Sequence, residues 1–146
     1  MFDRQGDVAQ AINQERRALA LREQLPDPAD RAISHNNLAN YLGRHGTSPA
    51  LAESRCHRVA ALIYFFVAGL GQHLQTSLGN YVIEFRRARD TGTEPAVPRV
   101  AELLADSTFH PLAQWLNQRQ VNLNDLQTDV DQLLDQARQV SAGKVP

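Results

Sequence analysis

The feature that most constrains the fold of this chain is an internal repeat. The stretch NLANYL at 37–42 matches SLGNYV at 77–82, so that a leucine, an asparagine and a tyrosine recur 40 positions later. A second match, ALAL at 18–21 against AALI at 60–63, recurs after 42 positions. Because the two kinds of stretch alternate, the chain is built from pairs of unlike segments. A helix pair repeated at such a period is the unit of an α-solenoid.

The breaks between segments predict helices and no strand. Glycine and proline fall between stretches whose apolar residues recur every three or four positions. Asp27 before Pro28 and Ser48 before Pro49 each predict a helix start, because an N-cap side chain accepts a backbone N–H and proline fits the first turn. We therefore expect an all-α fold. The predicted helices cover about residues 7–25, 28–43, 48–70, 72–89, 99–105, 108–118 and, starting at 122 or 124, the stretch up to 140.

Two of these segments resemble a known repeat family. NNLANYLGRHG at 36–46 resembles helix A of a tetratricopeptide repeat, with its small and apolar packing positions and its turn glycine filled by Leu38, Ala39, Leu42 and Gly46. AINQERRALALREQLPDP resembles helix B with its closing proline. The period exceeds the usual length of about 34 residues, and in this it is similar to the longer repeats of kinesin light chain. The resemblance spans about residues 7 to 90 and implies a TPR-like α-solenoid of antiparallel helix pairs.

The resemblance also implies how the chain is organised. Residues 1–92 are expected to form TPR-like repeats, of which the first is incomplete because the chain starts in a helix B. Residues 93–146 match no repeat, and we expect them to form a C-terminal helical cap packed as one domain with the repeats. Two repeats are fewer than the roughly three that a stable stack needs. Either a second copy of the chain covers the other end, or the chain is part of a longer array.

The asparagines of the repeat are the first candidate site. In the family, helix A lines a concave groove, and the resemblance places Asn37, Asn40 and Asn80 on the groove side as readers of a bound peptide backbone. An amide suits this role because it donates and accepts at once. The alternative is that these side chains bond neighbouring helices or water. Arg44 is a candidate for an acidic peptide, or else a cation that complements the helix C-terminus.

Three consecutive aromatic residues are the second candidate site. Tyr64, Phe65 and Phe66 cannot all point to one side of a helix. At least one must therefore face away from the local helix pair, toward the C-terminal helices or toward another copy of the chain. We expect a patch for self-association.

Composition excludes several classes of partner. The formal net charge of −1 gives no general attraction to nucleic acid or to an anionic membrane. The most apolar stretch, 59–71, is shorter than the roughly 20 residues of a membrane span. The single cysteine, Cys56, permits no internal disulfide and fits a reducing compartment, so we expect a cytoplasmic protein.

We expect no enzyme activity, no metal and no cofactor. The sequence has no HExxH, P-loop, GxGxxG or GxSxG motif. Glu53 and His57 are four apart and share a helix face, but no paired motif accompanies them. The sequence thus predicts a non-catalytic protein–protein interaction domain that captures a peptide or helix. The alternative is a structural module that forms homo-oligomers without a groove ligand.

Overall fold

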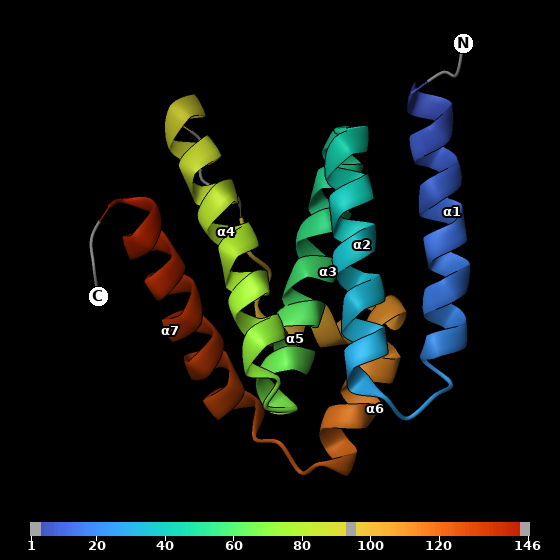
Figure 1. The fold of residues 1–146 in the computed structure, drawn as a ribbon. Helices are drawn as coiled ribbons and strands as arrows, with labels where there is room; N and C mark the ends of the chain where they lie inside the picture. The colour runs from blue at the N-terminus through green and yellow to red at the C-terminus, as the bar shows by residue number, and fades with distance from the viewer. Residues whose placement is uncertain (1–3, 93–95, 144–146) are drawn as a thin grey trace. The chain divides into compact units, whose positions relative to one another are not determined.

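The computed structural model describes residues 4–92 and 96–143. Within these ranges every regular element is helical and no strand occurs, which confirms the all-α prediction (Figure 1). The helices are α1 (Arg4–Arg22), α2 (Pro28–His45), α3 (Ser48–Val67), α4 (Gly71–Thr91), α5 (Val100–Ala105), the 3-10 helix η1 (Ser107–Phe109), α6 (His110–Gln118) and α7 (Leu123–Ser141).

The chain divides into two compact units, here called unit 1 and unit 2. Unit 1 ends at Gly69 and contains α1 to α3, and unit 2 begins at Leu70 and contains α4 to α7. The sequence grouped α4 with the repeats and placed a boundary after residue 92. In the structure α4 packs along α7, and the division between the two units falls at Gly69–Leu70. The packing of residues 93–146 with the repeats as one domain stays a prediction.

Local signals in the sequence explain where the helices of unit 1 begin and end. The Asp27 side chain accepts from the backbone N–H of Ala29 at 2.9 Å, and α2 then starts at Pro28 as predicted. Gly46 ends α2 with a φ of 77°, a left-handed conformation that a side chain would strain. The cap of α3 differs from the prediction. Thr47 accepts from the Ala50 N–H at 3.3 Å, so Ser48 is the first helical residue.

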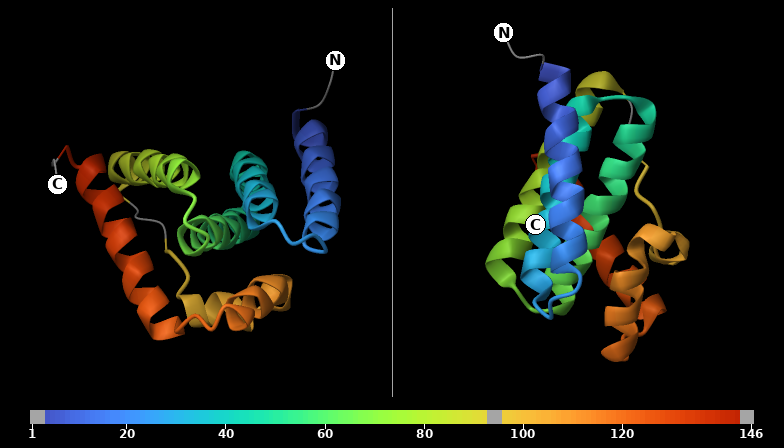
Figure 2. Two further views of the ribbon diagram at one scale, coloured as in Figure 1. Left: turned by 60° about the horizontal axis from the view of Figure 1, so that its bottom comes forward. Right: turned by 90° about the vertical axis from the view of Figure 1, so that its right-hand side faces the viewer.

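The three helices of unit 1 form an up-and-down row with α2 in the middle. Short turns reverse the chain after α1 and after α2, so that neighbouring helices are antiparallel (Figures 1 and 2). Leu38 and Leu42 of α2 are buried in a cluster with Ile12 and Leu19 of α1. Ala39 is fully buried as well. The packing positions that the resemblance assigned to α2 are therefore confirmed as buried.

Helix α3 is buried on all sides between Val59 and Phe65. The seven consecutive residues from Val59 to Phe65 are each at most 2% exposed. A helix that is apolar all round is expected inside a protein. Among the described residues, no helix is both long and apolar enough to cross a membrane.

Unit 2 is held by α7, whose apolar stripe faces inward. Its residues at spacings of three and four are buried, namely Leu126, Val130, Leu134 and Ala137. The Gln127 side chain accepts from the backbone N–H of Val100 at 2.7 Å and so joins α7 to the start of α5. On α6, Trp115 is buried with 6% exposure, and the Arg119 guanidinium lies 4.4 Å from its ring centroid.

Candidate binding face on helix α2

Helix α2 has one buried face and one accessible face. Leu38 and Leu42 point into unit 1. The opposite face has residues spaced by four, three and four positions, which keeps them on one side of a helix. This face, called the α2 stripe below, consists of Ile33, Asn37, Asn40 and Arg44, of which Asn37 is half-buried and the others are exposed. The stripe combines one apolar side chain, two amides and one cation.

The two asparagines of the stripe lean toward different neighbours. The Asn37 amide nitrogen donates to Glu15 Oε1 of α1 at 3.5 Å, a long hydrogen bond. The Asn40 amide oxygen accepts from the Arg58 guanidinium of α3 at 3.2 Å. Both asparagines therefore bond neighbouring helices, the alternative that the sequence left open. Each contact uses one end of the amide, so Asn37 can still accept and Asn40 can still donate.

Arg44 lies in the last turn of α2 and is exposed. Its guanidinium is 5.8 Å from the centroid of the Tyr41 ring, within the range of a cation–π contact. A cation here also complements the C-terminal end of the helix. Arg44 thus has a structural role that does not prevent it from meeting an acidic partner.

Asn80, the equivalent of Asn40 in the second match, is half-buried on α4. Helix α2 belongs to unit 1 and α4 belongs to unit 2. The predicted groove between residues 28–44 and 72–89 therefore stays a prediction. The accessible face of α2 is the part of this predicted groove that lies within a single unit.

The aromatic residues predicted for self-association are mostly inside the chain. Tyr64 is 0% and Phe65 is 2% exposed, and Phe66 is half-buried. The Tyr64 ring stacks on His35 of α2, with ring centroids 5.8 Å apart. Tyr64 and Phe65 are thus buried, and self-association through these three residues stays a prediction.

A chain of polar side chains lies on the buried side of α2. It includes Glu53 and His57, which the sequence placed on one helix face. His35 Nδ1 is 2.8 Å from His57 Nδ1, and both side chains are buried. His57 Nε2 is 3.1 Å from Glu53 Oε2, which confirms that these two residues share a face of α3. Arg16 of α1 pairs with the same carboxylate, with Nη2 2.9 Å from Oε1. This polar chain leads from half-exposed Arg16 to the interior.

Each charge state in the polar chain follows from its neighbours. The hydrogen bond from His57, followed by that from Arg16, lowers the pKa of the Glu53 carboxyl to about 2. Burial lowers the pKa of His35 well below its ordinary value, and the adjacent His57 and the positive Arg31 act in the same direction. Burial raises the pKa of Tyr64 to about 12. Near neutral pH, Glu53 is ionised while His35 and Tyr64 are neutral.

His35 was not among the residues predicted to form a site. The residue stands three positions before Leu38 and seven before Leu42, on the stripe that packs inward. A histidine on such a stripe must be buried, and a buried imidazole needs a partner. That signal predicts a partner on a neighbouring helix but cannot name His57, 22 positions away. Across residues 4–92 and 96–143, no group of three or more side chains is arranged to hold a metal ion.

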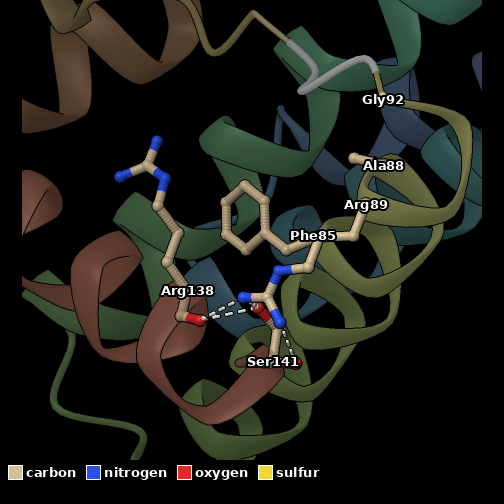
Figure 3. Close-up of a pocket in the computed structure, with 6 residues that line it drawn as sticks. All are labelled: Phe85, Ala88, Arg89, Gly92, Arg138 and Ser141. Carbon is tan, nitrogen blue, oxygen red and sulfur yellow. Dashed lines mark hydrogen bonds between the residues drawn. The ribbon is translucent and has the colours of Figure 1, made fainter. Parts of the chain in front are cut away.

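Unit 2 contains a pocket of about 310 Å³ between α4 and α7. Figure 3 shows the Arg89 guanidinium turned toward the last turn of α7 and the Arg138 side chain beside the Phe85 ring. Arg89 donates to the Ser141 carbonyl at 2.7 Å, to the Ser141 hydroxyl at 2.9 Å and to the Arg138 carbonyl at 3.2 Å. These bonds satisfy carbonyls at the end of a helix. Arg89 therefore clamps α4 to α7. The lining residues are Phe85, Ala88, Arg89, Gly92, Arg138 and Ser141.

Comparisons with protein-family models, with curated proteins and with solved structures found no match to this chain. The tetratricopeptide-like character of residues 7 to 90 thus rests on the sequence resemblance.

Proposed function

We propose that unit 1 is a non-catalytic protein–protein interaction module that captures a peptide or helix along the α2 stripe. One observation carries the proposal. The Asn37 amide nitrogen and the Asn40 amide oxygen each bond a neighbouring helix. The Asn37 oxygen can therefore accept from a ligand, and the Asn40 nitrogen can donate to it. This is the complement of a peptide backbone, in which each residue supplies an N–H and a C=O.

The dimensions of the stripe are consistent with a short segment. Ile33 and Arg44 are 11 residues apart, which corresponds to about 16 Å along a helix axis. An extended peptide rises by about 3.3 Å per residue, so about five residues lie along this length. The proposed ligand places an apolar side chain near Ile33, a backbone amide near the asparagines and an acidic group near Arg44.

The contacts of Asn40 allow a variant that separates binding from folding. Asn40→Asp keeps an oxygen that accepts from Arg58 and loses the amide donor. Asn37→Ala removes the acceptor of Asn37 and leaves Glu15 within 3.5 Å of Arg22. Asn13 lies on the exposed face of α1, so Asn13→Ala is the matched control.

The test is a selection of peptides from a random library against the full chain, followed by calorimetric titration of the enriched peptides. We expect Asn37→Ala and Asn40→Asp each to weaken binding by roughly five- to tenfold, the value of one hydrogen bond of about 1 kcal/mol or slightly more. Asn13→Ala should bind like the unchanged chain, and all variants should retain their helical circular dichroism. Equal affinity for all three variants, or no enriched peptide, would contradict the proposal.

A further inference from the structure

The His35–His57 contact requires a defined arrangement of protons. The two Nδ1 atoms are 2.8 Å apart, a hydrogen-bond distance, and both imidazoles are at most 1% exposed. Such a bond needs one N–H and one lone pair. A pair of buried N–H groups facing each other, or a pair of lone pairs, would lose the bond at a site that water does not reach.

The Glu53 end of the polar chain fixes which nitrogen carries the proton. An ionised carboxylate only accepts, so His57 Nε2 must donate across its 3.1 Å contact with Glu53 Oε2. When the pair is neutral, His57 Nδ1 is therefore a lone pair and His35 Nδ1–H donates to it. We assign these tautomers from the hydrogen-bond partners.

One additional proton is compatible with this arrangement. If it enters at His35 Nε2, the Nδ1 proton of His35 can cross the 2.8 Å bond to His57. The result is an imidazolium at His57 between a neutral His35 and the Glu53 carboxylate. The positive charge then lies beside a negative one, and both hydrogen bonds are kept.

A second additional proton is not compatible with it. Both imidazoles would be cations, and two N–H groups would face each other at 2.8 Å in the interior. Three neighbouring groups do not relieve this repulsion. Arg31 of α2 is a cation, Tyr64 of α3 is neutral, and Glu53 is already paired with Arg16 of α1.

We propose that the His35–His57 pair is a pH-sensitive latch between α2 and α3, which stays closed with one additional proton and opens when a second is bound. This inference does not depend on the proposed binding function. It stands on the geometry of the pair, its burial and the fixed carboxylate at one end.

The direction of the pH effect follows from proton linkage. Burial, His57 and Arg31 lower the pKa of His35 in the folded chain, so the unfolded chain binds more protons in mildly acidic solution. The stabilising contribution is complete above the unfolded pKa of about 6.5 and decreases as the pH falls below it. Glu53 does not contribute in this range, because its pKa is about 2.

The experiment is urea unfolding of the full chain at pH values from 8 to 5, with hydrogen exchange of residues 28–67. As the pH falls below 6.5, we expect the unfolding equilibrium constant of the unchanged chain to rise up to tenfold more per pH unit than that of His35→Gln. The reason is that the variant takes up one proton fewer when it unfolds. His110→Gln removes an exposed histidine of unit 2 and should behave like the unchanged chain. Equal pH slopes for His35→Gln and the unchanged chain would overturn the latch.

Two measurements keep the inference testable even if His35→Gln fails to fold. Nitrogen-15 spectra of the unchanged chain should show His35 protonated at Nδ1 and His57 at Nε2 at pH 7.5. Glu53→Gln removes the anion beside the imidazolium, so exchange of α2 and α3 should accelerate at a higher pH than in the unchanged chain. Titration of His35 at its ordinary pKa of about 6.5, or an unmoved exchange transition in Glu53→Gln, would count against the latch.

Discussion

Among the described residues, unit 1 buries the polar side chains Ser34, His35, Ser54, His57 and Arg58, whereas unit 2 buries Ser77 and Ser141. In unit 1 the helices are joined by hydrogen bonds through the interior, such as that from Ser54 Oγ to the Ala39 carbonyl at 2.6 Å. In unit 2 the hydrogen bonds between α4 and α7 lie at the helix ends, where the exposed Arg89 donates to Ser141. The two halves of one all-helical chain thus differ in where their polar contacts are placed.

This difference has a physical consequence. When one partner of a buried hydrogen bond gains or loses a proton, the other partner is left unsatisfied. The folded state then loses the full free energy of desolvating that group, because water cannot replace the partner. An exposed clamp is supplemented by solvent and by neighbouring charges, so its loss is less costly. We therefore expect unit 1 to depend on pH and on conservative polar changes, and unit 2 to depend mainly on its apolar stripe.

The largest expected effect tests whether the two units are separate. Leu38→Ala in unit 1 and Leu126→Ala in unit 2 truncate leucines that are at most 2% exposed. Each should lower the free energy of unfolding by about 2–5 kcal/mol, the cost of a buried leucine together with its cavity. Hydrogen exchange should accelerate in the altered unit and stay unchanged in the other. Leu21→Ala, at a residue that is 65% exposed, is the control. Equal acceleration across the whole chain would remove the distinction between the units.

An intermediate effect is expected at the exposed clamp of unit 2. Arg89→Ala removes three hydrogen bonds to the last turn of α7 and should lower the free energy of unfolding by about 1–2 kcal/mol, below the value for a buried arginine. Arg89→Lys keeps the charge and loses the planar fork, so it should recover less than half of the loss. Arg87→Ala, at an exposed arginine of the same helix, should change stability little. If Arg87→Ala matches Arg89→Ala in urea unfolding, general charge rather than the clamp is responsible.

The smallest effect distinguishes two adjacent residues in unit 1. Thr47→Ala removes the side chain that accepts from the Ala50 N–H and should cost about 1 kcal/mol. Ser48→Ala alters the first residue of α3 and should stay within about 0.5 kcal/mol. Thermal unfolding by circular dichroism measures both. The reverse order would place the cap at Ser48, as the sequence alone predicted.

Local sequence signals predicted most of the helix boundaries, and their success has local causes. Asp27, Pro28 and Gly46 act on backbone groups within four residues, so their effect can be read from the sequence directly. The cap of α3 was misplaced by one residue because both Thr47 and Ser48 precede Pro49 and serine is in general the better cap. The burial of Leu38, Ala39 and Leu42 followed from helical periodicity.

Contacts between distant segments were harder to predict. The pairing of Glu53 with His57 was visible as a spacing of four, whereas the partner of His35 depends on how α2 packs against α3. The same packing turns Asn40 toward Arg58 and stacks the Tyr64 ring on His35. Spacing within a helix defines a face, but it does not say which neighbour the face meets.

The single tryptophan has a practical consequence for following these differences. Trp115 is the chain's one indole and lies in unit 2, under the guanidinium of Arg119. Arginine keeps its charge in solutions from mild acid to mild base, so the cation above the ring is present throughout. Fluorescence emission therefore reports on unit 2, while far-ultraviolet circular dichroism reports on the helices of both units. The unfolding of unit 2 can therefore be compared with that of the whole chain without attaching a dye.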